Sequence, residues 1–222
     1  MRQSVIDYID GRLEMKLIDI SHTLDENTPA FPGDYKTILS KNRTLEENYY
    51  NAYLLQSGLH TGTHIDAPMH LTNDIRTIDE FPLDSFCGRG VLLDVRGEKT
   101  ISMKPAYREM INEQNIVLLF TGFDKVYFEE EYFTQHPVVG DDLASFLLSR
   151  KIKMLGMDMP SPDCSPYTLH KELLRNGIFV LENLTNLQSL IGAPNFEVMA
   201  LPLKLSAEAS FVRAVCLIDT AA

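Results

Sequence analysis

The chain has 222 residues, of which 45% are hydrophobic, and this length can bury a sizeable core in a single domain. Its formal net charge is −11 at pH 7. Nucleic acid and anionic membranes are therefore excluded as expected partners, because either would require clustered Lys and Arg. No stretch approaches the roughly 18 apolar residues that span a bilayer, and the acidic composition suits a soluble cytoplasmic protein.

The N-terminal segment predicts a short helix that packs on the body or on a neighbouring subunit. Four apolar residues recur there at helical spacing, namely Val5, Ile6, Ile9 and Leu13. Charged residues run through the segment, so it lacks the apolar stretch of a secretory signal peptide. We therefore expect an N-terminal helical extension over residues 1–15 and one domain over residues 16–222.

A strand over residues 16–24 leads to a rigid turn over residues 28–34. Two prolines of this turn fix their own backbone dihedral angles, and Gly33 leaves the backbone of the next position free to turn. Phe31 lies between the prolines. An aromatic ring held in this way is a candidate for the wall of a substrate pocket, and a plain core position is the alternative.

Residues 60–70 contain the densest group of metal-binding side chains in the sequence. Three of the six histidines, His60, His64 and His70, fall within these eleven positions together with Asp66. Neutral imidazole and carboxylate are the usual nitrogen and oxygen ligands of zinc, manganese and iron. The segment therefore predicts a site for a divalent metal.

The local conformation of this motif is predicted to be extended chain or a tight turn. A helix would place His60 and His64 on one face, but Gly62 and Pro68 interrupt a helix. In an extended chain that follows a strand over residues 51–59, His64 and Asp66 share one side of the pleat. Gly62 then allows the backbone to approach the metal or its ligands.

Strands and helices alternate after the motif, which indicates an α/β domain. Buried strands are predicted over residues 90–95, 115–121, 153–157 and 178–181, helices over residues 104–112, 140–150 and 167–176, and two closing strands over residues 197–205 and 211–218. Asp141 or Asp142 is the expected N-cap of the second helix, and Gly177 ends the third. Neither a repeat nor a linker divides the chain.

The segment over residues 125–136 is aromatic and acidic. Its negative charge excludes a stacking platform for nucleic acid. We interpret it as a surface loop or lid that packs its aromatic rings inward, and His136 within it as a structural or exposed histidine.

The three cysteines, Cys87, Cys164 and Cys216, are an odd number without Cys-x-x-Cys spacing. This composition favours a reducing compartment over a disulfide framework. A nucleophilic Cys164 is an alternative, but nothing in the sequence activates its thiol.

Two downstream residues are further candidates for the metal site. A proline-rich loop over residues 158–163 follows a predicted strand, and open α/β sheets place their ligands at such strand ends. His170 lies in the next predicted helix, and Glu182 directly follows the strand over residues 178–181. A carboxylate there is costly to bury unless it is paired or bound to a metal.

On these residues the chain resembles the cyclase family of metal-dependent hydrolases, whose best-characterised members are bacterial kynurenine formamidases. The motif His-x-Gly-Thr-His-x-Asp-Ala-Pro-x-His over residues 60–70 carries the resemblance. Further segments agree in order, namely residues 28–34, 133–137, 158–163, 181–184, 201–205 and 212–214. The resemblance extends from about Leu17 to the C-terminal end.

The resemblance implies a single-domain α/β fold with a mixed, barrel-like β core surrounded by helices, assembled as a homodimer or homotetramer. It implies two divalent ions per subunit, with zinc first and manganese or iron as alternatives. His60, His64 and Asp66 would bind the first ion, and His170 would complete a second site bridged by Asp66 and Glu182. His70 would donate and accept the proton, and Phe31 takes the place of a tryptophan that contacts substrate in the formamidases.

The implied activity is hydrolysis of an amide or formamide bond by a metal-activated hydroxide, with N-formylkynurenine as the leading substrate. The chain has no tryptophan, and Ala209-Ser210-Phe211 departs from a family turn that usually has glycine and proline. Two alternatives follow. The first is hydrolysis of another cyclic amide or a lactone, as in the isatin hydrolases that resemble this family. The second is a metal-binding protein without turnover.

Overall fold

Strand β8 (Ile116–Phe120) is the element on which both hydrophobic cores of the molecule are built. In the computed structural model, which describes residues 5–6 and 15–219, all five of its residues are buried. Ile116 and Leu118 pack into one core, whereas Val117 and Leu119 pack into the other, because successive side chains of a strand point to opposite faces. A strand covered on both faces requires a continuous apolar run, which confirms the predicted buried strand.

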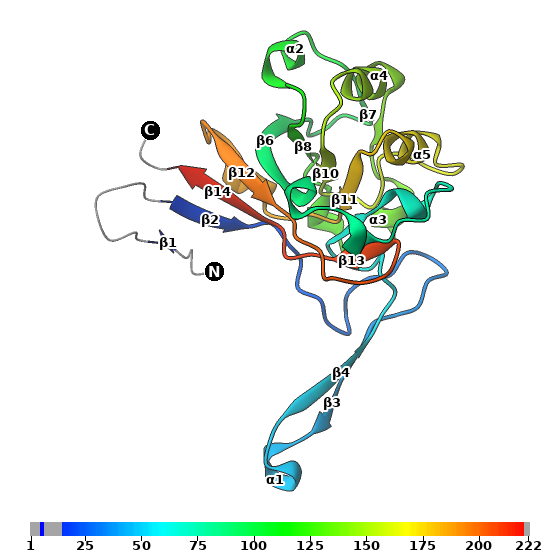
Figure 1. Cartoon of the computed structure of the whole chain (residues 1–222), viewed down its shortest axis with the longest axis vertical. Helices are drawn as coiled ribbons and strands as arrows, with labels where there is room; N and C mark the ends of the chain where they lie inside the picture. The colour runs from blue at the N-terminus through cyan, green and yellow to red at the C-terminus, as the bar shows by residue number, and fades with distance from the viewer. Residues whose placement is uncertain (1–4, 7–14, 220–222) are drawn as a thin grey trace.

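Ten strands form one mixed sheet in the order β1-β2-β14-β12-β6-β8-β10-β11-β5-β13 (Figure 1). The central strands β6, β8, β10 and β11 run parallel to one another, and the remaining pairs are antiparallel. The other strands of the sheet and their bounds are β1 (Val5–Ile6), β2 (Met15–Asp19), β5 (His64–Asp66), β6 (Cys87–Asp94), β10 (Met154–Met157), β11 (Phe179–Glu182), β12 (Phe196–Met199), β13 (Ala209–Phe211) and β14 (Val215–Asp219). Two small sheets pair β3 (Ile38–Arg43) with β4 (Ala52–Gln56), and β7 (Thr100–Ile101) with β9 (Val138–Val139).

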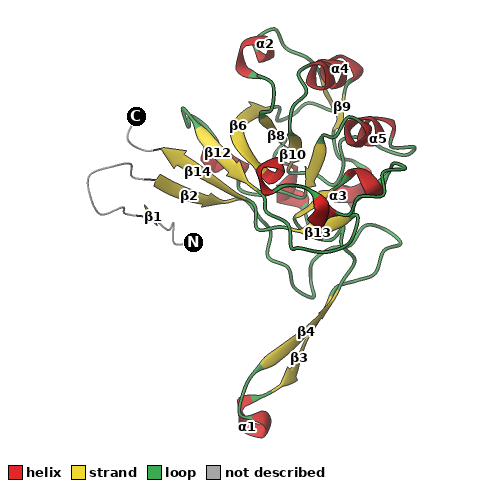
Figure 2. Cartoon of the chain, in the orientation of Figure 1, coloured by secondary structure: helices red, strands yellow, loops and turns green. Residues whose placement is uncertain are grey.

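The sheet curls so that strands from its two ends share one core. Ile18 of β2 and Cys216 of β14 belong to the same buried cluster as Ile65 of β5 and Leu181 of β11. Helices α4 (Asp141–Ser149) and α5 (Thr168–Arg175) cover the opposite face and fill the second cluster with their leucines (Figure 2). The predicted fold class, a mixed α/β domain with a barrel-like β core, is confirmed.

The remaining helical elements are short. They are α1 (Leu45–Asn48), α2 (Tyr107–Met110) and α3 (Glu131–Thr134), with 3₁₀ turns η1 (Pro68–His70), η2 (Ile78–Glu80), η3 (Leu83–Phe86), η4 (Phe123–Val126) and η5 (Leu187–Leu190). Within the described residues, the structure contains no helix of the length and apolarity that crossing a membrane requires.

Several local predictions need correction. The strand predicted over residues 197–205 ends at Met199 of β12. The strand predicted over residues 211–218 is divided between β13 and β14.

The helix predicted over residues 104–112 is reduced to the single turn α2, because Ile111 turns into an extended conformation and its side chain enters the core. The N-cap of α4 is Gly140 and not an aspartate. The Asp142 carboxylate instead accepts hydrogen bonds from the Leu143 and Met103 amides.

The predicted N-terminal helix is described at only two positions before Met15. Val5 and Ile6 form strand β1, which pairs with Lys16 and Met15 of β2. β-branched residues favour strands, and β2 offers them an edge whose backbone groups need partners. The rest of that segment lies outside the described residues.

A hairpin projects from the body and is here called the arm, residues 35–57 (Figure 1). Strands β3 and β4 form its stem, and α1 lies at its tip. Strand β4 confirms the strand predicted over residues 51–59 and leads into the histidine motif. The rigid turn predicted before the arm is also present, since the Asp34 amide donates to the Phe31 carbonyl at 2.9 Å and Gly33 has φ +100°.

Candidate metal centre

Strand β5 carries His64 and Asp66 between β11 and β13. The register places His64 directly opposite Glu182, the last residue of β11. Opposite residues of antiparallel strands project to the same face, and the His64 Nε2 lies 3.4 Å from a Glu182 oxygen. The predicted extended conformation is confirmed, and η1 follows it and carries His70.

Asp66 lies at the centre of the group and is fully buried. One of its carboxylate oxygens is 2.9 Å from the His60 Nδ1 and 3.5 Å from the His64 Nε2. The other oxygen is 3.1 Å from the His170 Nε2, on the third residue of α5. The His170 Nδ1 in turn lies 3.7 Å from Glu182. The structure therefore brings together all the metal ligands proposed from the sequence.

Several polar atoms of this group are buried without a hydrogen-bond partner. They are His64 Nε2, both carboxylate oxygens of Asp66, His170 Nε2 and Glu182 Oε1. Buried polar groups without partners are costly, so five of them at one place require an explanation. Two ligand atoms bound to a tetrahedral zinc ion lie about 3.3 Å apart. The separations around Asp66 and His64 run from 2.9 to 3.5 Å, which is compatible with donors arranged around a divalent metal.

Two sets of three side chains place their donor atoms within 4.8 Å of one another. The first set, His60, His64 and Asp66, is the predicted first site. The second contains Asp66, His70 and His170, so His70 stands in it where Glu182 was predicted. His70 is predicted to be the proton carrier, and its ring lies 4.1 Å from the His60 ring and 5.6 Å from the His170 ring. Its position is thus compatible with proton transfer at the site and also with metal ligation.

Burial and neighbouring carboxylates shift the pKa values of the imidazoles in opposite directions. Burial opposes a charge on His60, but the Asp66 carboxylate 2.9 Å from its Nδ1 and a hydrogen bond with Glu208 outweigh it and raise the His60 pKa to about 10. For His70, burial dominates and neighbouring imidazoles add to its effect, which lowers the pKa to about 4 despite Asp66. Burial would raise the pKa of Asp66, yet His60 and His64 hold it well below its ordinary value.

The orientation of His64 is fixed by the backbone of Gly62, which was expected to approach the ligands, and through it by Asn183 and Tyr132, which were not proposed as site residues. The His64 Nδ1 lies 2.8 Å from the Gly62 carbonyl, which also accepts a hydrogen bond from the Asn183 amide at 2.9 Å. An Nδ1–H that donates to this carbonyl leaves Nε2 free for a metal. The Asn183 side-chain oxygen accepts from the buried Tyr132 hydroxyl at 2.8 Å. Asn183 has φ +55°, a left-handed conformation in which asparagine is enriched. The signal in the sequence that could have identified it is an asparagine directly after the predicted ligand Glu182.

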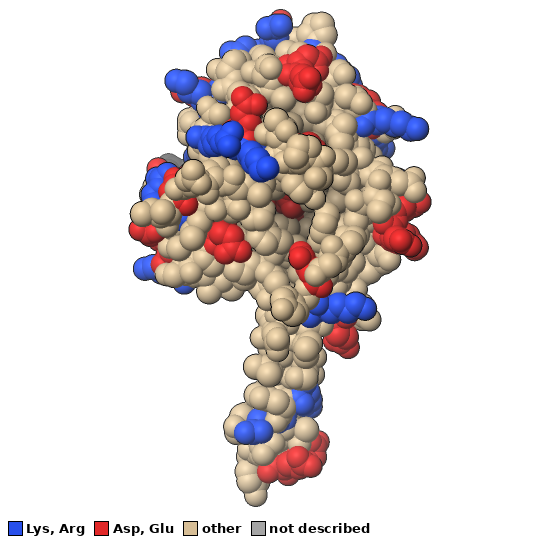
Figure 3. All heavy atoms as spheres, turned by 90° about the vertical axis from the view of Figure 1, so that its right-hand side faces the viewer, with Lys and Arg blue, Asp and Glu red and all other residues tan. Residues whose placement is uncertain are grey.

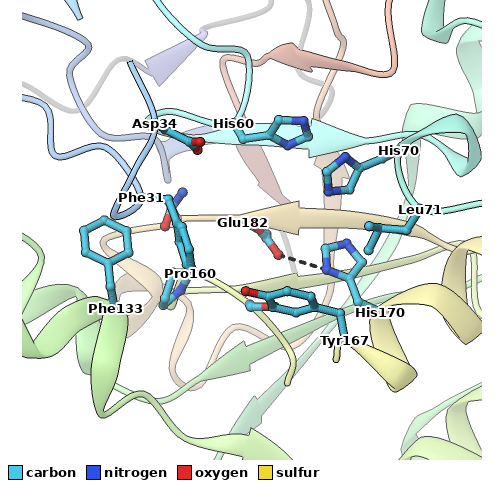
Figure 4. A pocket seen from close by; sticks show the side chains of 12 residues that line it. Phe31, Asp34, His60, His70, Leu71, Phe133, Pro160, Tyr167, His170 and Glu182 are labelled. Atoms are coloured by element: carbon cyan, nitrogen blue, oxygen red, sulfur yellow. Dashed lines mark ion pairs between the residues drawn. The ribbon is translucent and has the colours of Figure 1, made fainter. Parts of the chain in front are cut away.

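The donor group forms one end of a cavity of about 270 Å³ (Figure 4). Phe31 and Phe133 lie at the other end, with their ring centroids 5.6 Å apart in an edge-to-face contact. Tyr167 lies beside His170, and Pro160 comes from the proline-rich loop after β10. Phe31 thus lines the pocket, which is one of the two locations predicted for it, the other being a core position. Asp34 also lines the pocket and was not anticipated.

The aromatic loop packs Tyr127 and Tyr132 inward, as predicted, although Phe128 is 69% exposed. His136 belongs to neither donor set and contacts the Pro137 carbonyl through Nδ1. Cys164 is exposed, with its sulfur 3.9 Å from the His136 Nε2.

The chain is similar to a described family and to curated enzymes over most of its length. Residues 18–164 match the family model described as "Putative cyclase". The kynurenine formamidase of Bacillus cereus is 32% identical over 207 residues, which cover 89% of this chain and 95% of the relative.

Solved structures share the fold. Isatin hydrolase A from Labrenzia aggregata, bound to benzyl benzoate, superposes with a TM-score of 0.81 at 22% identity, covering 92% of this chain and 94% of that chain. A protein described as a potential metal-dependent hydrolase with cyclase activity superposes with a TM-score of 0.74 at 25% identity, covering 92% of this chain and 98% of that chain.

Proposed function

This chain belongs to the cyclase family and is a hydrolase of carbon–nitrogen bonds other than peptide bonds. On that premise we propose that it is a metal-dependent amidase or formamidase. An aryl formamide of the N-formylkynurenine type is the leading substrate. A cytoplasmic location, predicted from the acidic composition and the cysteines, is part of the proposal.

The observation that carries this proposal is the set of five partnerless polar atoms at one end of an aromatic pocket. His60, His64 and Asp66 would hold a first divalent ion, and Asp66, His170 and Glu182 a second. Zinc is the first choice, and manganese or iron suit the same donors. When bound, such ions make a water acidic near neutral pH and polarise a carbonyl oxygen.

The chain's own residues supply positioning and proton transfer. Phe31, Phe133 and Tyr167 line the pocket and would hold the aryl ring, because aromatic pairs favour edge-to-face and offset contacts. An imidazole nitrogen of His70 would take the proton of the attacking water and deliver it to the leaving amine, a role in which histidine is the commonest residue.

The charge of the pocket also bears on the substrate. Of the described residues that line it, none is Lys or Arg, and Asp34 is a carboxylate outside the proposed metal ligands. A substrate that carries an ammonium group near its aryl formamide would find an opposite charge there. N-formylkynurenine has such a group next to its carboxylate, so its ammonium would face Asp34 and its carboxylate would point away from it.

A second candidate is hydrolysis of another cyclic amide or of a lactone. The observation that favours it is Phe31, where the formamidases that this chain resembles carry a tryptophan. A smaller ring at this position offers a substrate less stacking area.

The test is the initial rate of N-formylkynurenine hydrolysis by the full chain loaded with zinc or manganese, beside a chelated control. Rapid turnover that chelation abolishes is the expected result. Phe31→Ala should raise KM, whereas Phe31→Trp should retain turnover. Absence of turnover in protein shown to carry metal would reject the aryl formamide and favour the cyclic amide or lactone.

A further inference from the structure

Glu208 contacts a proposed metal ligand without being one of the proposed ligands. Its Oε1 lies 3.3 Å from the His60 Nε2, and it belongs to neither of the two donor sets. The other ring nitrogen of His60, Nδ1, lies 2.9 Å from an Asp66 oxygen. The His60 ring is therefore held between two carboxylates, one inside the donor group and one outside it.

The backbone at Glu208 is fixed to the strand that carries Asp66. The Glu208 carbonyl accepts a hydrogen bond from the Ala67 amide at 2.9 Å, and the next residue, Ala209, pairs with Asp66 in the register of β13 and β5. The same strand pairing thus positions both residues whose carboxylates contact His60. The Glu208 side chain is 38% exposed, so a substitution there removes the contact without opening a cavity in the core.

The contact bears on which nitrogen of His60 is free to bind an ion. An imidazole ring binds a metal through one nitrogen, and its other nitrogen then carries a proton that needs an acceptor. In His60 the nitrogen that faces Asp66 is Nδ1, which leaves the Nε2–H group to donate to Glu208. A carboxylate acceptor at this place fixes the tautomer and the orientation of the ring and makes the ring a more basic ligand.

Negative charge alone does not distinguish Glu208 from other residues. Acidic side chains are scattered over the face of the molecule that Figure 3 shows. A distant carboxylate attracts a cation in general, but it does not select between the two tautomers of one imidazole. Only an acceptor within hydrogen-bond distance of a ring nitrogen does so.

We propose that Glu208 is a positioning residue, which holds His60 in the tautomer and orientation that offer Nδ1 to the first metal ion. This inference rests on the metal site of the proposed function. It concerns the binding of the ion, so it can be tested without a substrate. A role confined to the stability of the fold would leave the metal affinity of a folded variant unchanged.

The first test is the zinc affinity of the full chain, measured by competition with a chromogenic chelator. Glu208→Ala should weaken zinc binding by about 10- to 100-fold, the usual effect of losing such an outer partner. Glu208→Gln keeps an oxygen that can accept from the Nε2–H group and should restore part of the affinity. Glu197→Ala is the matched control, because it removes an exposed glutamate of β12 and should bind zinc as the wild type does. Far-ultraviolet circular dichroism verifies that each variant is folded.

The second test reads the tautomer of His60 directly. Two-bond ¹H–¹⁵N correlation spectra of the zinc-loaded chain distinguish a histidine protonated at Nε2 from one protonated at Nδ1, and the signals absent from His60→Gln belong to His60. The wild type should carry the proton on Nε2, and Glu208→Ala should lose the signal of this proton to exchange with water.

The outcomes separate this inference from the proposed function. A wild-type His60 protonated at Nδ1, or a zinc affinity of Glu208→Ala equal to that of Glu197→Ala, would overturn the inference and leave the proposed function in place. A wild type that binds no divalent metal would overturn both.

Discussion

The candidate metal centre and the arm are opposite in polarity and burial, and each lacks a partner. At the centre, polar atoms of His64, Asp66, His170 and Glu182 are buried without hydrogen bonds. On the arm, several tyrosines and leucines are exposed by 44% to 89%. A buried polar atom is satisfied by an ion or a hydrogen bond, whereas exposed apolar area is satisfied by another apolar surface. The two regions therefore require different contacts, a divalent cation at the centre and an apolar surface at the arm.

Asp66→Ala should have the largest effect on the first region, because Asp66 contacts His60, His64 and His170. We expect loss of bound metal and a fall in turnover of more than about 1,000-fold, since the ions supply several kcal/mol of catalysis. Elemental analysis of dialysed protein and the initial rate measure the two effects. Asp34→Ala removes a pocket carboxylate outside the donor sets and should retain the metal. Full metal content in Asp66→Ala would contradict the assignment.

His70→Ala separates the two roles that its position allows. As a proton carrier it should be replaceable without loss of metal, while turnover falls by about 100- to 1,000-fold. Metal content and rate are measured on the same preparation. A loss of metal from this variant would instead make His70 a ligand, as the set formed with Asp66 and His170 permits.

The parts of the site that could be predicted are those encoded locally. His60, His64 and Asp66 lie within seven residues, so their proximity follows from the sequence itself. His170 and Glu182 reach the site through the position of α5 and the register of β11 against β5. That register depends on the tertiary structure, and the periodicity of the sequence does not by itself place His170 and Glu182 at the metal site.

The residues that orient a metal ligand through intermediate hydrogen bonds could not be predicted from the sequence. Asn183 and Tyr132 contribute hydrogen bonds whose partners are 51 and 121 residues away.

Strand β3 was also missed, because Ser40, Lys41, Asn42 and Arg43 lack the apolar alternation by which a half-buried strand is identified. An uncovered arm has no buried face to produce that pattern.

Tyr132→Phe should have an intermediate effect on metal affinity, because Tyr132 influences the ligand His64 through Asn183 and the Gly62 carbonyl. The variant loses the hydroxyl that donates to Asn183, and Asn183 in turn donates to the carbonyl that orients His64. Loss of such an outer partner lowers metal affinity by about 10-fold or more, which competition with a chromogenic chelator measures. Tyr127→Phe is the matched control, because the buried Tyr127 hydroxyl has no partner. Equal affinities in the two variants would exclude this route.

Leu55→Ala should have the smallest effect, and it tests the contrast between arm and body directly. Leu55 lies on the stem of the arm and is 44% exposed, so Leu55→Ala should change the free energy of unfolding by less than about 0.5 kcal/mol. Leu118→Ala, at a fully buried leucine of β8, should lower it by about 2–5 kcal/mol. Urea unfolding followed by circular dichroism gives both values. A loss at Leu55 comparable to that at Leu118 would mean that another surface covers the arm in solution.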